Sequence, residues 1–406
     1  MASTINTNIA SINAQRNLGL SATSLATSMQ RLSSGLRVNS AKDDAAGLAI
    51  SERMNTQVRG LTVASRNAND GISLAQTAEG ALGKVGDMLQ RMRELAVQAS
   101  NATNSKADRA ALQAEVKQLS DEIDRVAKQT SFNGQKILDG SFVGAVFQVG
   151  ANSGDNVTLG ALADTRGTGL ANISYSTGSA PAVDPAAITG FATAIPANTL
   201  SIQVGSSTAI DLGGIKGAMS GVERLGQVVS AINAKSADTG ITAYLTKTDA
   251  GTYDLEFMSS KIGADGVTPE PVVLAGFDVA NSGFDAATVQ GTFVAASGIE
   301  KTGIDNVTVS TQRDAWVALK KIDSAIDQVN SARADLGALQ SRFESAVANI
   351  DIQVENLAAS RGRIIDADFA KETANLSRTQ ILQQAGTAMV AQANQLPQQV
   401  LQLLQG

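Results

Sequence analysis

The C-terminal flank of the chain carries a long stripe of apolar positions. Between residues 319 and 357 an apolar side chain recurs at every third or fourth position. This is the period of an α-helix with coiled-coil character, sustained over about five heptads. A helix over about residues 312–360 would be on the order of 70 Å long, so we predict a rod that needs partners along its length. The stripe consists of Leu319, Ile322, Ile326, Val329, Ala332, Leu336, Leu339, Phe343, Val347, Ile350, Val354 and Leu357.

The N-terminal flank repeats this pattern in two segments. One apolar stripe predicts a long helix that ends near residues 101–104, and a second stripe predicts another helix after it. Ser105 and Asp108 have the spacing of a capping box that starts the second helix. Together the helices predict an elongated bundle closed by both ends of the chain, although an ordinary amphipathic core fits the same stripes. The two stripes are Ile50, Met54, Val58, Leu61, Leu82, Val85, Leu89 and Met92, then Leu112, Val116, Leu119, Ile123 and Val126.

The middle of the chain has a different pattern. Five of the six prolines lie between residues 181 and 271, and proline breaks helix interiors. Phe132-Asn133-Gly134 predicts a tight turn, and the apolar residues between 142 and 149 predict short strands or a hairpin. Further strand-like runs occur at 200–204, 241–245, 253–257 and 272–274, with a helical stretch at 222–234. We predict a small α+β or β-rich insertion over residues 172–302, which projects from the rod.

The two ends of the chain are almost free of charge. Residues 1–40 contain no Asp or Glu, and residues 373–406 contain one charged side chain, Arg378. Such segments bury too little apolar area on their own to offset their ordering entropy. We therefore predict arms that are disordered in the monomer and helical in an assembly, whereas ordinary frayed termini are the alternative. The apolar positions proposed for assembly are Leu25, Met29, Leu32, Leu36, Leu376, Ile381, Leu382, Met389 and Val390.

Composition removes several classes of function. The 406 residues include no histidine and no cysteine, which excludes His-dependent catalysis, zinc helices and thiol chemistry. The net charge of −6 without basic clusters argues against nucleic-acid binding. No stretch is apolar enough to span a membrane, and the N-terminus lacks the pattern of a signal peptide. Catalysis by carboxylates alone remains open but has no positive support in the sequence. We expect no enzyme, no metal and no cofactor, in a protein that is cytosolic or exported without a cleaved signal.

Both ends of the sequence resemble bacterial flagellin. The N-terminal match includes Ile5-Asn-Thr-Asn-Ile-Ala-Ser-Ile-Asn-Ala-Gln-Arg-Asn-Leu18 and continues through residues 32–51, 66–80 and 89–98. The C-terminal match covers residues 359–364 and Gln380-Ile-Leu-Gln-Gln-Ala-Gly-Thr-Ala-Met-Val-Ala-Gln-Ala-Asn394. In all, the resemblance covers roughly residues 1–165 and 305–406. The middle matches nothing we can name.

The resemblance implies a mainly α protein with long paired terminal helices, a short β-hairpin and three domains. Residues 1–43 with 364–406 would form an inner helical domain, residues 44–171 with 303–363 a rod-like bundle, and residues 172–302 a variable outer domain. It implies a secreted, extracellular subunit of the flagellar filament, exported unfolded by the flagellar type III system. Its partners would be copies of itself, an export chaperone, and the filament cap and hook–filament junction proteins.

The resemblance also implies a site read by the host Toll-like receptor for flagellin. The matching positions are Gln90, Arg91 and Leu95 on one predicted helix, with Glu115 on the next. Helical spacing would place four residues in one mixed polar and apolar surface patch: Gln90, Arg91, Glu94 and Leu95. A contact between subunits is the primary role we expect for this patch, and a receptor that reads such a surface would engage only monomers.

Three other classes of protein share some of these sequence features. A hook–filament junction protein shares the helical ends but is disfavoured by the close match to both flagellin end motifs. A protease in the outer domain could not be of the zinc type, because the chain has no histidine. A coiled-coil signalling receptor would need a membrane segment, which the sequence lacks.

Overall fold

The protein forms two compact units. The computed structural model describes residues 7–248, 250–263, 265, 268–296 and 300–404, with the backbone alone for 396–404. One unit comprises Met1–Gly71, Val146–Val157 and Arg342–Gly406, and the other comprises Ile72–Ala145 and Thr158–Ser341. We call them the terminal unit and the central unit. The sequence predicts three domains, which is a finer division than these two units. That division remains a prediction.

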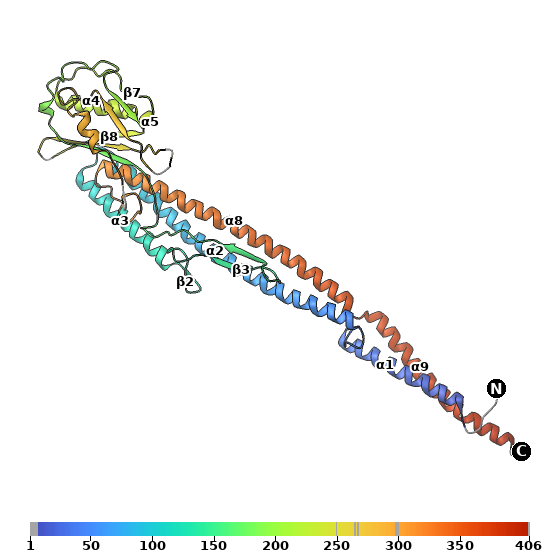
Figure 1. The fold of residues 1–406 in the computed structure, drawn as a ribbon. Helices are drawn as coiled ribbons and strands as arrows, with labels where there is room; N and C mark the ends of the chain where they lie inside the picture. The colour runs from blue at the N-terminus through green and yellow to red at the C-terminus, as the bar shows by residue number, and fades with distance from the viewer. Residues whose placement is uncertain (1–6, 249, 264, 266–267, 297–299, 405–406) are drawn as a thin grey trace. The chain divides into compact units, whose positions relative to one another are not determined.

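Five helices account for the two flanks of the sequence (Figure 1). They are α1 (Ile9–Ser34), α2 (Ala45–Ala99), α3 (Lys106–Gln129), α8 (Gln312–Ile365) and α9 (Phe369–Leu404). Helix α8 has 54 residues and begins and ends close to the predicted bounds, while α2 has 55 residues and ends just before the predicted stop. The prediction of a mainly α protein with long terminal helices is confirmed.

The predicted stripes are the packed faces of these helices. No stripe residue of α8 is exposed, and Ile322, Val329 and Phe343 are among those that are fully buried. In α2 the stripe is buried from Leu61 onward, but Ile50 at its start is 37% exposed. Burial of each such side chain contributes about 1.5–3 kcal/mol, so the stripes supply the main stabilisation of the helices.

Local sequence signals set the helix ends. The Ser105 hydroxyl accepts a hydrogen bond from the Asp108 amide, and the Asp108 carboxylate accepts one from the Ser105 amide at 2.9 Å. The predicted capping box is therefore confirmed. At the start of α2, the Asp44 carboxylate accepts a hydrogen bond from the Gly47 amide at 2.8 Å. Both caps satisfy amide groups that have no partner within the first helical turn.

In the terminal unit, α2 and α8 pack closely around an aromatic side chain. Phe343 of α8 is fully buried and meets Phe147 edge to face, with 5.3 Å between the ring centroids. On α2, a Cβ atom placed on Gly71 would lie 2.7 Å from Cζ of Phe343. The absence of a side chain at Gly71 is therefore what lets the ring sit against the helix.

Two short antiparallel pairs of strands interrupt the helical flanks. Strands β1 (Ser131–Phe132) and β2 (Gln135–Lys136) are joined by Asn133 and Gly134, whose φ angles are +48° and +81°. Positive φ at both turn residues is typical of a type I′ hairpin, and the turn that the sequence predicts at these residues is confirmed. The second pair consists of β3 (Ala145–Gln148) and β4 (Asn156–Leu159).

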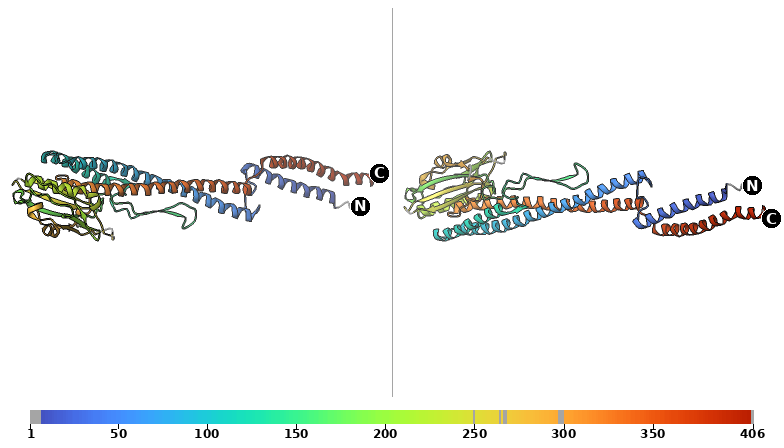
Figure 2. Two further views of the ribbon diagram at one scale, coloured as in Figure 1. Left: turned by 90° about the horizontal axis from the view of Figure 1, so that it is seen from above. Right: turned by 90° about the horizontal axis from the view of Figure 1, so that it is seen from below.

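The insertion is an α+β domain within the central unit, and Figure 2 shows its strands beside its helices. One antiparallel sheet has the strand order β11-β5-β9-β8, and the other has the order β10-β6-β7. Helix α4 (Gly221–Ala234) packs on β8, with Leu225, Val228 and Ile232 fully buried in a core that includes Phe257. The remaining elements are β5 (Ser176–Val183), a 3₁₀ turn (Pro185–Ala187), β6 (Ser201–Val204), β7 (Ile210–Asp211), α5 (Ser236–Thr239), β8 (Ile241–Lys247), β9 (Tyr253–Ser259), β10 (Val272–Ala275), α6 (Val279–Ser282), α7 (Ala286–Thr292) and β11 (Val294–Ala295).

Strand β5 was absent from the sequence prediction. It lies between β9 and β11, although it contains Pro181, which lacks a backbone donor. The register with β9 shifts between Ala180 and Val183, so Pro181 falls in a bulge and takes no place in the regular ladder. The pairing with β9 is therefore a tertiary effect that the local composition did not reveal.

The insertion is seated on the first turns of α8. Tyr175, just before β5, meets Trp316 of α8 at 6.2 Å between ring centroids, and both pack around the buried Met258. Beside them Arg313 forms an ion pair with Glu256 of β9 at 3.0 Å. Burial raises the pKa of Glu256, and the Arg313 guanidinium opposes this shift. The contact therefore combines ring packing with a partly desolvated ion pair.

We expect Gly71→Ala to destabilise the protein and Gly80→Ala, on the same helix, to leave it as stable or more so. Alanine gains up to about 1 kcal/mol over glycine in a helix interior. At Gly80 nothing lies within 4 Å of the added Cβ, whereas at Gly71 the buried Phe343 ring must move. Such overpacking costs about 1–3 kcal/mol. Thermal unfolding followed by circular dichroism compares the two variants, and equal midpoints would contradict this packing.

Candidate assembly surface

The two ends of the chain form the helices α1 and α9, which lie side by side (Figures 1 and 2). Their pairing is antiparallel, because the Asn8 side chain donates to the Ala393 carbonyl at 2.7 Å, while Gly35 accepts from the Ala367 amide at 2.9 Å. The Ser11 hydroxyl also donates to the Asn394 side chain at 2.7 Å. The first and last segments of the sequence thus bind one another along their length.

Local signals define where each arm begins and ends. Asn8 caps α1, since its side chain accepts from the Ser11 amide at 3.1 Å, and Gly35 ends α1 with a φ of +72°. Beyond Gly35 the chain forms an antiparallel bridge between Leu36 and Asp366. The Arg37 amide donates to the Ile365 carbonyl at 2.7 Å, which ties the two non-helical joints together.

The arm pair buries little apolar surface. Among the described side chains of the two helices, the buried ones are Ser11, Ser28, Glu372, Thr379 and Ala393. None of these is a large apolar residue, which distinguishes the arms from the packed stripes of α2 and α8. The two helices therefore lie close together along their length but share little fully buried apolar core.

Large apolar side chains lie on the outside of the arms instead. Of the predicted assembly residues, Met29, Ile381, Leu382 and Met389 are exposed, between 49% and 65%, and Leu25, Leu32, Leu36, Leu376 and Val390 are half-buried. The sequence prediction missed Ile9, Ile12, Leu20 and Phe369, which are 58–69% exposed. Exposed apolar residues gathered on charge-poor helices mark an interaction surface. Their apolar character was visible in the sequence, but their exposure was not.

The predicted receptor residues lie on α2 and α3 in the central unit. Arg91 forms ion pairs with Glu94 at 2.9 Å and with Glu115 of α3 at 2.8 Å. Hydrogen bonds to Glu94 and then to Glu115 raise the pKa of Arg91, so its positive charge is fixed. Gln90 is exposed, and the side chains of Arg91 and Glu115 are 50% and 44% exposed. These three residues form an accessible polar patch across two helices.

Leu95 does not belong to this exposed patch. It is 1% exposed and lies in the packed core of the helices. The expectation of a mixed polar and apolar surface that includes Leu95 is therefore wrong for this residue. The apolar stripe of the sequence already indicates that Leu95 is buried. Leu95 follows Met92 by three residues and continues the series of Leu82, Val85 and Leu89.

The described residues also bear on whether the chain holds a metal ion or crosses a membrane. Within them no group of three acidic, His or Cys side chains could hold a metal ion. No helix in the part of the chain that the structure describes is long and apolar enough to cross a membrane. Long packed helices with exposed apolar ends are features of a structural protein that binds other chains.

The comparisons with known proteins agree with this class. Residues 5–143 match the bacterial flagellin N-terminal helical region, and residues 319–404 match the bacterial flagellin C-terminal helical region. Residues 199–261 match the flagellin hook IN motif. The chain is 39% identical to the B-type flagellin of Pseudomonas aeruginosa and 40% identical to flagellin B of Vibrio cholerae, with each alignment covering all of both proteins.

The chain therefore belongs to the bacterial flagellin family. It is a structural subunit of the extracellular flagellar filament, and not an enzyme. Among solved structures it is similar to FliC from Burkholderia pseudomallei, at 26% identity over 67% of this chain and 99% of that one, with a TM-score of 0.41. The relatives named above are flagellins, which favours this class over a hook–filament junction protein.

The different burial of Leu95 and Arg91 can be tested by the effect of each side chain on the stability of the fold. We expect Leu95→Ala to cost about 2–5 kcal/mol, because it leaves a cavity in the helical core. Arg91→Ala removes only exposed ion pairs, and we expect its unfolding midpoint to equal that of the native chain. Chemical denaturation measures both. A Leu95→Ala protein as stable as Arg91→Ala would contradict the buried position.

Proposed function

We propose that α1 and α9 hold neighbouring subunits together in the filament. The observation that carries this proposal is the set of exposed large apolar side chains on two charge-poor helices, which bury no described large apolar side chain fully between themselves. Burying one such side chain against another subunit is worth about 1.5–3 kcal/mol, so several per subunit can offset the cost of association, about 4–15 kcal/mol. Few charges need to be desolvated in the process.

The small buried core between α1 and α9 also supports the proposal that the arms are only marginally helical in the free subunit. The pair α1–α9 is stabilised by a few polar contacts, such as Asn8 with Ala393 and Ser11 with Asn394, and by small buried side chains. Two isolated helices with so little shared core are weakly stable in water. Assembly then supplies the missing contacts, so that ordering of the arms and polymerisation occur together.

We expect Ile381→Glu to abolish filament formation and to leave the folded monomer intact. Ile381 is 65% exposed on α9, so a carboxylate there stays hydrated in the monomer but must be desolvated in an apolar contact. Val294 on β11 is 63% exposed and provides the matched control, Val294→Glu. Electron microscopy after salt-induced polymerisation gives the readout. Normal filaments from Ile381→Glu would refute the role of this surface.

The proposed partners in the cell follow from these arms. An apolar arm that is loosely held in the monomer would bind an export chaperone before it reaches its place in the filament, and would meet the filament cap and hook–filament junction proteins at the two ends of the polymer. Export of the unfolded chain by the flagellar type III system is compatible with the absence of cysteine, since no disulfide has to be broken.

Export can be tested with a truncated chain. We expect the full chain to be found outside cells with an intact flagellar export apparatus and inside cells that lack it. A chain without residues 373–406 should no longer co-purify with the chaperone from cell extracts. The control variant Val294→Glu should still co-purify with it. Equal secretion with and without the apparatus would sink the proposed route.

Recognition by the host Toll-like receptor for flagellin is a second proposed role, and the exposed patch of Gln90, Arg91 and Glu115 supports it. We expect Arg91→Ala to lower receptor activation by soluble monomer in a reporter assay, because a fixed positive charge and two ion pairs are lost from the patch. Arg125→Ala is the control, since Arg125 is an equally exposed arginine that pairs with Glu122 on α3. Full activation by Arg91→Ala would remove the assignment.

A further inference from the structure

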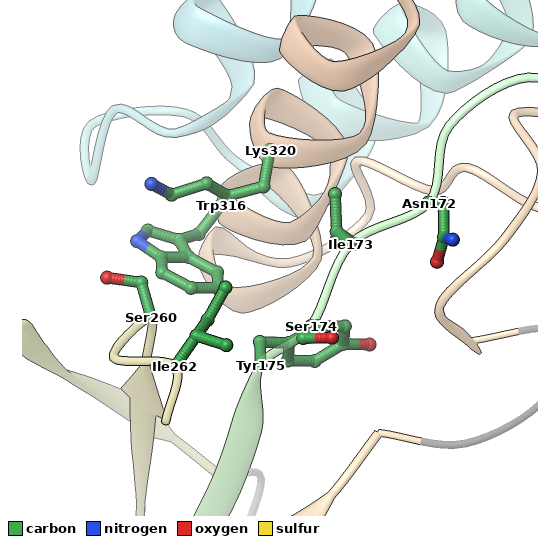
Figure 3. A pocket seen from close by; sticks show the side chains of 8 residues that line it. All are labelled: Asn172, Ile173, Ser174, Tyr175, Ser260, Ile262, Trp316 and Lys320. Carbon is green, nitrogen blue, oxygen red and sulfur yellow. The ribbon is translucent and has the colours of Figure 1, made fainter. Parts of the chain in front are cut away.

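A small cavity lies where the insertion meets the first turns of α8 in the central unit (Figure 3). Its volume is about 240 Å³. Three segments contribute to it: residues 172–175 before β5, Ser260 and Ile262 after β9, and Trp316 with Lys320 on α8. At about 30 Å³ for each water, the space holds roughly eight waters, which corresponds to one ring-sized ligand and no more.

One side of this cavity is aromatic and apolar. The Trp316 indole is half-buried and faces into the cavity near Ile262 (Figure 3). Tyr175 packs against the indole, with 67° between the ring planes, and Ile173 lies between Trp316 and Asn172 (Figure 3). The indole is therefore a fixed wall and not a mobile surface side chain.

The other lining groups are polar, and their side chains form few hydrogen bonds within the described part of the chain. Within the described part of the chain the side chains of Asn172 and Ser174 make no hydrogen bond, and Lys320 forms no ion pair. The Lys320 ammonium lies 5.7 Å from the centroid of the Trp316 ring, and the Ser260 hydroxyl makes one long bond of 3.4 Å to the Gly240 carbonyl. No lining residue is acidic. The cavity is thus rich in hydrogen-bond donors and positively charged.

These features restrict the chemistry of a ligand. A cation would be repelled by Lys320, and a bare inorganic anion would leave the indole wall unused. A pyranose ring presents C–H groups on one face, which pack against the negative face of an aromatic ring, and hydroxyl groups at its edge. A carboxylate on that ring would accept a charge-assisted hydrogen bond from the Lys320 ammonium.

The geometry points to a binding site for one acidic sugar residue of the hexuronate type at this cavity. The ring packs against Trp316, the carboxylate contacts Lys320, and a hydroxyl group at the ring edge contacts Ser260, which lies at the same end of the cavity (Figure 3). Because the cavity lies on the insertion and on α8, the site is independent of the apolar surface of the arms. The filament subunit would in this way bind a polysaccharide that carries such residues.

Trp316 makes the test direct, because it is the single tryptophan of the chain. The full-length monomer is titrated with methyl glucuronide, methyl glucoside and benzoate at constant ionic strength, and the tryptophan fluorescence is recorded. We expect a saturable change with the glucuronide and a Kd of about 1–10 mM, as is usual for a single ring in a shallow site. The neutral glucoside should bind about fivefold to tenfold more weakly, because it lacks the contact with Lys320.

Two variants assign the contacts. Lys320→Ala should bind the glucuronide no better than the glucoside, while Lys117→Ala, which removes an exposed lysine from α3, should bind like the native chain. Ser260→Ala should weaken the binding of both sugars and leave that of benzoate unchanged. The proposal is overturned if the glucuronide causes no saturable change up to 100 mM, which is on the order of ten times the expected Kd. It is also overturned if benzoate binds as tightly as the glucuronide, or if Lys320→Ala keeps the preference for the charged sugar. Saturation-transfer NMR on the same samples checks that a fluorescence change reports binding.

Discussion

The structure depends on the packing of helices from the two ends of the sequence against each other. In the terminal unit Gly71 of α2 admits the ring of Phe343 from α8, and Leu61 packs against Ile350 in the same way. In the central unit the same two helices are joined by contacts such as the ion pair of Arg93 with Asp323 at 2.6 Å. An apolar stripe of one helix is stable in water only when another stripe covers it, so neither flank of the chain can fold without the other.

The arms α1 and α9 show the opposite arrangement of apolar side chains. Along α2 and α8 the large apolar side chains are covered within the chain, whereas along α1 and α9 many of them remain exposed, as Ile381 and Met389 do. The contrast explains how one polypeptide can be both a stable subunit and a building block. The covered stripes hold the subunit together, and in the proposed function the uncovered residues are buried by contacts between subunits.

The insertion packs against α8 beside a small cavity. Its sheet is seated on α8 through Tyr175, Trp316 and the ion pair of Arg313 with Glu256. Nearby, the buried Lys321 donates to the Asn306 side chain at 2.7 Å, and burial lowers its pKa to about 8. Aromatic and ionic contacts thus fix the insertion on the helix, and the small cavity at Trp316 is a consequence of that junction.

The sequence alone determined the features that depend on local rules. The period of three and four residues defined α2, α3 and α8, the Ser105–Asp108 spacing defined a cap, and Asn133-Gly134 defined a turn. The strands β6, β8, β9 and β10 and helix α4 were also evident, as was the scarcity of charge in the arms. These signals are local because they reflect the backbone geometry of a few neighbouring residues.

Only the tertiary structure decided which side chains are covered and by what. It placed β5 between two strands despite Pro181, moved Leu95 from the expected surface into the core, and brought Trp316 and Lys320 beside Asn172. It also showed that the arms pair through small and polar residues and leave Ile9, Ile12, Leu20 and Phe369 exposed. The physical reason is that burial and strand pairing depend on partners distant in the sequence, and a local pattern shows only that a partner is needed.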